Sequence, residues 1–406
     1  MTIPIQPTKD TPMNIAIPKG FRLATANAGF RQKERDDVAL VISDTPAVAA
    51  ALFTQAAFVA APVIVARGMM RDSATKRAVL INTGQANACT GDQGLANCRE
   101  TLRLASMACG LPAAEILPAS TGVIGAQMKM DCWEKVIPAL TAKLGTAGIE
   151  DFASAIRTTD AFAKFSGTEV VTQKGTITLA GMAKGAGMIC PNMATMLCVV
   201  LCDAAVSPEI WQSMFADAVE KTFNRVTVDG DTSTNDTIYG LANGASGVSP
   251  DKDDLPLLRD ALEKTLGNLA YMLVQDGEGA TKVMRIAVTG AASNADAEKV
   301  ARTVGHSQLV KTAMYGRDAN WGRIVAAVGR SGAVFAAKDV RLSLCGVELF
   351  RNEQPVDIDF DTLLKDPLQG RDIAIDISLG SGQGEYTLLA SDLTHKYVDI
   401  NADYRS

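Results

Sequence analysis

The sequence predicts an α/β (α+β) fold with a large N-terminal part and a smaller α+β unit towards the C-terminal end. Three observations support this. In the first two thirds of the chain, short apolar runs typical of buried strands alternate with amphipathic segments typical of helices. From about residue 282 the pattern changes to closely spaced strands with two short helices. Finally, 406 residues, 47% of them hydrophobic, are enough for a substantial core and for more than one structural unit.

The first 91 residues contain apolar runs that indicate strands. Residues 38–43 and 63–66 are predicted as strands, and Asp44 between them is a candidate start for a helix or turn. Residues 79–91, VLINTGQANACTG, predict a strand followed by a loop rich in Gly, Asn and Thr. Such a loop suits recognition of a polar ligand or a simple turn, and the sequence leaves both open.

Two helices are predicted next, over residues 97–109 and 132–144, and Gly110 is a common helix stop. Between them, apolar residues flank Ser120, Thr121 and Gly122. This small polar turn can present a hydroxyl and a glycine N–H to a developing oxyanion. The alternative is an ordinary turn that uses glycine for its positive φ.

The stretch KGAGMICPNMATMLCVVLC, residues 184–202, joins a loop to a buried strand. Gly185, Gly187 and Pro191 are typical of a loop, and the apolar run 196–202 fits a strand that is buried on both faces. The loop lacks the order of a phosphate-binding P-loop. Thr195 is therefore predicted at a junction between loop and strand.

A threonine hydroxyl is a poor nucleophile unless a base lies beside it. The chain has two histidines, His306 and His395, and neither lies near a recognisable nucleophile motif, so a Ser-His-Asp or Cys-His arrangement is disfavoured. Cleavage of the bond between Ala194 and Thr195 would free an α-amino group with a pKa of about 7.7–8, which can act as the base. The alternative is that Thr195 is there only because threonine favours strands.

The region after the buried strand carries further candidate side chains. Asp229, Asp231 and Asp236 share one hydroxyl-rich loop, and a network of internal hydrogen bonds is favoured over a calcium site because the acidic twelfth ligand is absent. An amphipathic helix follows over residues 258–273. Glu278 then stands between two glycines, where its carboxylate is either solvated or available to a cationic ligand.

The C-terminal part is predicted to contain more strands than helices. GSGQGE, residues 380–385, is predicted as a hairpin loop, because a dinucleotide fingerprint would lie between a strand and a helix. The predicted strands are 332–336, 340–349, 372–378 and 386–390, and the predicted helices are 297–304 and 309–314.

The composition excludes several classes of protein. The net charge of −6, with no run rich in Lys or Arg, argues against nucleic acid or an anionic membrane as the main partner. No segment has the length and hydrophobicity of a signal peptide or membrane span, so a cytoplasmic location is expected. The eight cysteines form no C-x-x-C pair and no histidine lies at ligand spacing, so no metal site is expected.

Several motifs occur together: NTGQANACTG, PASTGVIG, TTDAFAK, KGAGMICPNMATML, VDGDTSTNDT, DGEGATK, DANWGRI and INADYRS. From about residue 15 to the end, the chain resembles the glutamate N-acetyltransferase/ornithine acetyltransferase family of arginine biosynthesis. The resemblance implies an N-terminal-nucleophile-like αββα sandwich of the ornithine acetyltransferase/D-aminopeptidase type. It also implies a precursor that cleaves itself between Ala194 and Thr195.

The implied products are an α chain, residues 1–194, and a β chain, residues 195–406. Residues 195–281 would complete the sandwich, and about 282–406 would form the smaller unit, with a tail that returns to the site. The two chains would stay together and pair into an α2β2 assembly.

The resemblance also implies roles for individual residues. Thr195 would be the nucleophile, and Thr121 and Gly122 would form the oxyanion hole. The residues implied to hold the amino-acid substrate are Thr158, Lys184, Thr195, Glu278, Asn401 and Ser406. The chain differs from the usual residues of the family at Ala56, Gln85, Ala161, Ala163 and the terminal Ser406, which bears on substrate preference and on use of acetyl-CoA.

The implied reaction is a ping-pong acetyl transfer without a bound cofactor. Thr195 takes the acetyl group from N2-acetyl-L-ornithine and passes it to L-glutamate, giving L-ornithine and N-acetyl-L-glutamate. Some members of the family also accept acetyl-CoA, and this second donor stays open. Two alternatives remain: an N-terminal-nucleophile aminopeptidase or amidase of the same fold, which passes the acyl group to water, and a non-catalytic amino-acid-binding relative.

Overall fold

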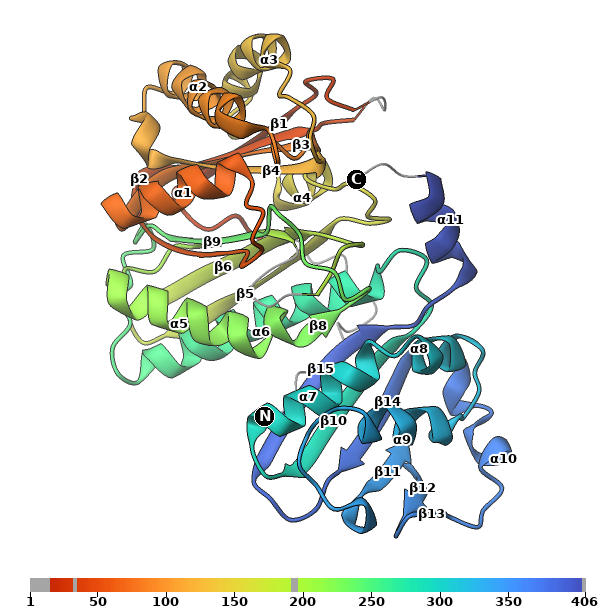
Figure 1. Cartoon of the computed structure of the whole chain (residues 1–406). Helices are drawn as coiled ribbons and strands as arrows, with labels where there is room; N and C mark the ends of the chain where they lie inside the picture. The colour runs from red at the N-terminus through yellow and green to blue at the C-terminus, as the bar shows by residue number, and fades with distance from the viewer. Residues whose placement is uncertain (1–14, 32–34, 191–195, 404–406) are drawn as a thin grey trace. The chain divides into compact units, whose positions relative to one another are not determined.

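The computed structural model describes residues 15–31, 35–190 and 196–403. The described residues form two compact units (Figure 1). The larger unit contains residues 15–224 and 231–273, and the smaller unit contains residues 225–230 and 274–403. Each unit is described by itself below.

The larger unit is built on one eight-stranded sheet with the order β4-β3-β2-β9-β7-β6-β5, in which β1 also pairs with β2. The long strand β2 connects the two halves of this sheet. Its first part pairs with β1 and β3, and after a register shift between Ile42 and Ala47 its second part pairs with β9. The strands are β1 (Phe21–Ala26), β2 (Val38–Phe53), β3 (Thr75–Gln85), β4 (Ile116–Val123), β5 (Lys164–Thr172), β6 (Gly175–Lys184), β7 (Leu197–Cys202) and β9 (Thr237–Ala242).

The two halves of the sheet face each other across a shared core. One buried cluster combines Leu23 and Ile81 from the β1–β4 half with Met182, Val199 and Leu241 from the β5–β9 half. Alternate residues of β7 enter this core, and the remaining ones are buried on the opposite face. The prediction that residues 196–202 form a strand buried on both faces is confirmed for β7.

Helices cover the outer faces of both halves. Leu102 of α2 and Trp133 of α3 pack on the β1–β4 half, whereas Trp211 of α5 donates a hydrogen bond to Gly240 O at 3.0 Å on the other half. Figure 1 shows α2 and α3 on one side of the sandwich and α5 and α6 on the other, which gives four αββα layers. The helices are α1 (Ala61–Asp72), α2 (Gly91–Cys109), α3 (Met130–Ala142), α4 (Ile149–Ala155), α5 (Pro208–Lys221) and α6 (Asp254–Gln275), with 3₁₀ turns at Ala113–Glu115 and Phe223–Arg225.

The smaller unit has a seven-stranded sheet with the order β13-β12-β11-β14-β10-β15-β8. Helices α7, α8 and α9 contribute to a buried cluster together with the strands. The strands are β8 (Val226–Thr227), β10 (Val283–Ala291), β11 (Arg341–Leu344), β12 (Val347–Arg351), β13 (Gln354–Pro355), β14 (Asp372–Ser378) and β15 (Gly384–Ser391). The helices are α7 (Asn294–Gly305), α8 (Gln308–Tyr315), α9 (Trp321–Gly329), α10 (Phe360–Leu364) and α11 (His395–Asp403), with 3₁₀ turns at Ala337–Asp339 and Pro367–Gln369.

Three predictions of secondary structure are wrong. Asp44 starts no helix, because β2 continues through it to reach β9. Residues 63–66 are helical, and Pro62 stands in the first turn of α1, where a missing N–H costs nothing. Residues 332–336 lie outside any strand.

The predicted hairpin at residues 380–385 is also wrong. Strands β14 and β15 do not pair with each other but flank β10 on its two sides. The connecting loop crosses the end of β10 so closely that a Cβ on Gly382 would lie 1.9 Å from Ala291 O. The glycines are therefore needed for a close crossing of two backbones.

The crossing predicts the effect of a side chain at Gly382. Gly382→Ala forces the loop away from β10, and we expect a loss of about 1–3 kcal/mol in the free energy of unfolding, as for other overpacked sites. Urea unfolding measures it. Gly329→Ala, at an exposed helical position with nothing within 4 Å of the new Cβ, is the matched control. A neutral effect of Gly382→Ala would contradict the crossing.

Candidate active site

Thr121 and Gly122 lie at the end of β4, which pairs in parallel with β3. Gly122 has a φ of +133°, and a Cβ there would lie 2.3 Å from the carbonyl carbon of Gly84 and 2.6 Å from Gln85 N. The position therefore admits only glycine. Both Thr121 and Gly122 are half-buried, so a hydroxyl and a backbone amide remain within reach of a ligand.

Lys184 lies beside this turn, at the end of β6. Its Nζ is 3.4 Å from Thr121 Oγ1, and the residue is only 8% exposed. Strand β6 pairs with β7 so that Lys184 lies opposite Leu197, two residues after Thr195. The structure thus brings together Thr121 and Lys184 at the end of the sheet where β7 begins. Ala194 and Thr195 themselves lie outside the described residues.

Asp160 connects this cluster to Thr158. One oxygen of its carboxylate accepts hydrogen bonds from Lys164 Nζ at 2.7 Å and from Gly185 N at 2.6 Å. The other oxygen accepts from Thr158 N at 2.8 Å and lies 3.4 Å from the Thr158 hydroxyl. Because Gly185 directly follows Lys184, one carboxylate fixes the backbone at two of the predicted substrate-binding positions.

The charge of Asp160 is set by its two neighbouring lysines. Burial by itself raises the pKa of this carboxyl, but Lys164 and Lys184, with the hydrogen bonds from Lys164 and Gly185, outweigh burial and lower the pKa below its usual range. The side chains of Asp160 and Lys164 are both fully buried. Asp160 therefore stays ionised at neutral pH and compensates the buried cations.

Two arginines from the N-terminal region hold the same turn. Arg31 donates to Arg157 O at 2.6 Å and to Thr158 O at 2.9 Å, and Arg35 donates to Arg157 O at 2.5 Å. Burial and the neighbouring Arg31 and Arg157 lower the pKa of Arg35. No local sequence pattern predicts these contacts, because more than 120 residues separate the partners.

The loop that carries the aspartates is a hydrogen-bonded network, as predicted. Asn235 Nδ2 donates to Ala86 O at 2.6 Å and to Ser120 O at 2.8 Å, which ties the loop to β4. Thr54 Oγ1 donates to Ser233 O at 2.7 Å. Asp229 belongs to the smaller unit, where Tyr397 OH lies 3.4 Å from its Oδ2. Within the described ranges, no three His, Cys, Asp or Glu side chains form a group that could hold a metal ion.

Glu278 and Asn401 lie together in the smaller unit. Asn401 Nδ2 on α11 donates to Glu278 Oε2 at 2.7 Å, and Thr394 Oγ1 donates to Gly279 O at 2.8 Å. Glu278 is buried, so the first of the two alternatives, a solvated carboxylate, is wrong, and availability to a cationic ligand stays a prediction. The reason is that α11 packs on this loop: a Cβ on Gly279 would lie 2.7 Å from Lys396 Cβ. Ser406 lies outside the described residues.

The two histidines belong to the smaller unit. Burial and the neighbouring cations Arg302, Lys311 and Arg330 lower the pKa of His306 to about 4. His395 begins α11, and its ring makes an edge contact with Tyr315 at 6.1 Å between centroids.

Gln85, which departs from the usual family residue, has a structural role. Its Nε2 donates to Gln127 O at 2.7 Å, and its Oε1 accepts from Lys129 N at 3.0 Å. The side chain thus holds the segment that leads into α3 against the end of β3. No contact explains the residues at Ala56, Ala161 and Ala163.

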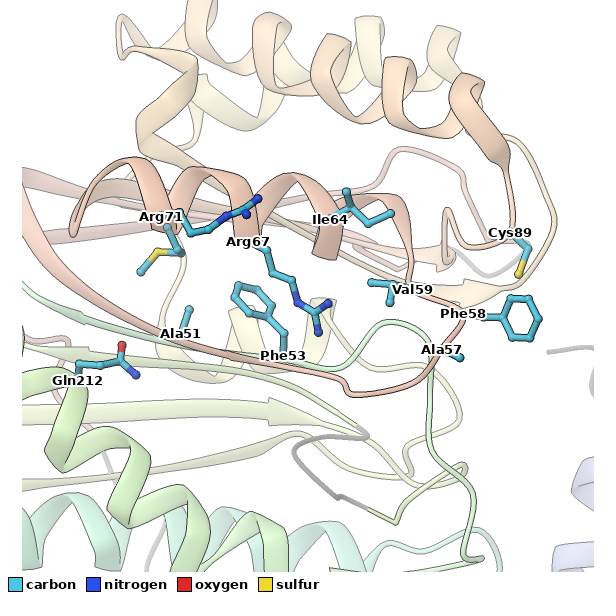
Figure 2. Close-up of a pocket in the computed structure, with 11 residues that line it drawn as sticks. Ala51, Phe53, Ala57, Phe58, Val59, Ile64, Arg67, Arg71, Cys89 and Gln212 are labelled. Carbon is cyan, nitrogen blue, oxygen red and sulfur yellow. The ribbon is translucent and has the colours of Figure 1, made fainter.

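A separate pocket of about 870 Å³ opens on the larger unit beside α1 (Figure 2). Its lining includes Phe53, Val59, Ile64 and Arg67, and it contains none of the predicted site residues. Arg67 donates to Thr54 O and lies over the Phe53 ring, so it is already held by the protein. The pocket is therefore not part of the candidate site.

No helix in the described ranges is long and apolar enough to cross a membrane. All eight cysteines are free thiols.

The candidate site consists of hydroxyl, amide, lysine and carboxylate groups. Such a set can bind an amino acid and stabilise an oxyanion, which are the requirements of acyl transfer.

Comparisons with known proteins agree with this chemistry. A model of the ArgJ family matches residues 22–406. The arginine biosynthesis bifunctional protein ArgJ of Nitratidesulfovibrio vulgaris is 68% identical over 391 residues, which cover 96% of this chain and all of that protein. The protein of the same name from Geobacter sulfurreducens is 44% identical over 392 residues, covering 96% and 99%.

Solved structures also match the chain. A chain of the Bacillus halodurans arginine biosynthesis bifunctional protein argJ is 35% identical and covers 52% of this chain and all of that chain, with a TM-score of 0.49. A chain of ornithine acetyltransferase from Mycobacterium tuberculosis, solved with ornithine, is 34% identical and covers 44% and 94%, with a TM-score of 0.41.

The buried ion pair predicts a large effect of Asp160→Asn. The variant leaves the Lys164 ammonium buried without its counter-charge, so we expect a loss of about 3–5 kcal/mol in the free energy of unfolding. Urea unfolding at pH 7 measures this loss. Asp251→Asn, which breaks a half-exposed pair with Lys174, is the control and should change little.

The same pair predicts a dependence on pH. The folded pKa of Asp160 is lowered, so its stabilisation is complete above the unfolded value of about 3.9 and is lost as the pH falls below it. The difference between wild type and Asp160→Asn should therefore shrink on acidification below about pH 4. A difference that stays constant down to pH 2 would contradict this assignment.

Proposed function

This chain belongs to the ArgJ family and is an acetyltransferase of arginine biosynthesis, and we propose that it moves the acetyl group of N2-acetyl-L-ornithine to L-glutamate. The products are L-ornithine and N-acetyl-L-glutamate. One observation supports this most directly: Thr121, Gly122 and Lys184 meet where β7 begins. In the sequence, Thr195 and Met196 come directly before β7. The substrates and the reaction sequence below are part of the proposal.

The nucleophile of the proposed reaction is the Thr195 hydroxyl. Self-cleavage of the bond between Ala194 and Thr195 frees the α-amino group of Thr195, whose pKa of about 7.7–8 allows it to take the hydroxyl proton near neutral pH. No histidine is needed.

The Thr121 hydroxyl and the Gly122 N–H are proposed to stabilise the oxyanion of the tetrahedral intermediate. The close approach of β3 and β4 at Gly84 and Gly122 keeps this turn rigid, because a side chain would not fit. Donors that are held in place before the reaction lower the barrier without further reorganisation. Lys184, 3.4 Å from Thr121 Oγ1, adds positive charge beside the same point.

Five side chains are proposed to bind the amino-acid substrate. Lys184 suits a carboxylate and Glu278 suits an ammonium group, whereas hydroxyls and the amide of Asn401 suit either. In the described structure Asn401 donates to Glu278, so a substrate ammonium would take over or share that carboxylate. The proposed binding residues are Thr158, Lys184, Glu278, Asn401 and Ser406.

The transfer runs in two half-reactions. First, Thr195 Oγ forms a bond to the acetyl carbon, the amide C–N bond breaks, and ornithine leaves with a proton on its nitrogen. Second, the amine of glutamate attacks the acetyl-threonine ester, the ester C–O bond breaks, and Thr195 regains its hydroxyl proton. The enzyme ends as it began.

Further parts of the proposal concern partners and location. The α and β chains are proposed to stay together and to pair into an α2β2 assembly. Acetyl-CoA is proposed as a second donor for the same acetyl-threonine intermediate. A cytoplasmic location is proposed because free cysteines are typical of a reducing compartment.

The second candidate is an aminopeptidase or amidase that passes the acyl group to water. Incubation with acetylornithine, with and without glutamate, separates the two reactions. Release of ornithine that depends on glutamate and gives N-acetylglutamate supports the transferase, whereas release that ignores glutamate supports the hydrolase.

Thr195→Ala tests the proposed nucleophile. The variant lacks the hydroxyl for both cleavage and transfer, so we expect one band near 42.7 kDa on a denaturing gel and no measurable transfer. Thr176→Ala, at an exposed position of β6, is the matched control and should be cleaved and active. Transfer at the wild-type rate by Thr195→Ala would exclude this mechanism.

Lys184→Met tests the proposed contact with the carboxylate. Loss of a charge-assisted hydrogen bond should lower kcat/KM by about 10- to 100-fold. Steady-state kinetics on acetylornithine measure it, and Lys174→Met, a half-exposed lysine on the turn before β6, is the control. The contact is ruled out if Lys184→Met, once cleaved and folded, has unchanged kinetics.

A further inference from the structure

Asp236 lies one residue from the start of β9 and beside the start of β7. These strands are parallel, and Thr237 lies opposite Leu197. The Asp236 carboxyl interacts with the hydroxyl and amide of Ser233 and with the amide of Met196. Met196 is the residue bonded to Thr195, so this carboxyl is held one peptide unit from the proposed cleavage point.

The second oxygen of this carboxyl has no assigned role. Asp236 is 2% exposed, and within the described ranges its Oδ2 has no hydrogen-bond partner. A buried carboxyl oxygen without a partner costs about 1–3 kcal/mol, so such groups are uncommon unless they serve a function.

The environment favours the proton-carrying form of Asp236. Burial raises its pKa well above the usual range, and the opposing effects of Lys184, Ser233 and Met196 do not compensate. Lys184 is the charged group that faces Asp236 from β6. When it carries a proton, the carboxyl offers an O–H donor at Oδ2, which has no hydrogen-bond partner among the described residues.

We propose that Asp236 is the proton-transfer group for self-cleavage between Ala194 and Thr195. This inference rests on the function proposed above, and it concerns the step before the α-amino group of Thr195 exists. In the uncut chain that nitrogen is an amide and cannot act as a base. A different group must then carry the proton.

Thr195 Oγ forms a bond to the carbonyl carbon of Ala194, and the C–N bond between the two residues breaks. The departing nitrogen takes the proton of Asp236, and Asp236 takes the hydroxyl proton of Thr195. Water then opens the resulting ester and gives the Ala194 carboxyl group and the free hydroxyl.

The other ionisable groups near the cluster are less suited to this step. Asp160 is held ionised, and both of its oxygens are occupied by Lys164, Gly185 and Thr158. Lys184 is a cation whose charge compensates Asp160. Among the described carboxyl groups of this cluster, Asp236 combines a raised pKa with an oxygen that has no hydrogen-bond partner.

The competing explanation is that Asp236 only positions the Met196 amide. Asp236→Asn separates the two roles, because the amide oxygen still accepts from Met196 but the side chain carries no transferable proton. Asp236→Ala removes both abilities. Asp231→Asn, an exposed carboxylate in the same loop, is the matched control.

The experiment follows cleavage of the full chain after synthesis is stopped, using denaturing gels for wild type and the three variants. We expect both Asp236→Asn and Asp236→Ala to slow cleavage by at least about 100-fold, as for loss of a general acid or base. Asp231→Asn should cleave at the wild-type rate. Thermal melting checks that each variant is folded.

The outcomes are distinct. Cleavage of Asp236→Asn within about threefold of wild type overturns the proposal, whether Asp236→Ala is slow or not. If Asp236→Asn does not fold, cleavage of Asp236→Ala is compared with and without sodium formate, which supplies a free carboxyl group in place of the missing side chain. Cleavage that formate restores supports the proposal, and cleavage that formate does not restore overturns it. A wild type that stays intact and active overturns self-cleavage itself, and with it the proposed function.

Discussion

The candidate site depends on a buried ion pair between Asp160 and Lys164. Both side chains are fully buried, and 2.7 Å separates Asp160 Oδ1 from Lys164 Nζ. The carboxylate also fixes the backbone of Thr158 and Gly185, so it holds the turn before β5 against the end of β6. Its charge further compensates that of the buried Lys184, which is 8% exposed.

The pKa values of two aspartates in the larger unit are shifted in opposite directions, and their environments explain the difference. Asp160 has two lysines and several donors, so its pKa is lowered, whereas burial dominates at Asp236 and its pKa is raised. Two acids of one chemical type can therefore serve as a fixed anion and as a proton carrier. The proposed proton transfer by Asp236 uses this difference in pKa.

The sequence predicted the main features of the site because they are local motifs. The turn at Thr121 and Gly122, the buried strand after Thr195 and the hydrogen-bonded loop at residues 231–237 follow from turn chemistry and apolar runs. It missed Asp160 as the central carboxylate, and the support from Arg31 and Arg35, because these contacts join distant segments. Residues 63–66 were mispredicted because short β-branched runs do not distinguish a strand from a helix.

Intact mass spectrometry of the purified protein tests the central claim, that a threonine freed at its N-terminus carries the acetyl group. The account predicts two chains, one ending at Ala194 and one beginning at Thr195, and a gain of about 42 Da on the second chain after brief exposure to acetylornithine. A single unbroken chain in fully active protein, or an acetyl group carried by the first chain, would contradict it.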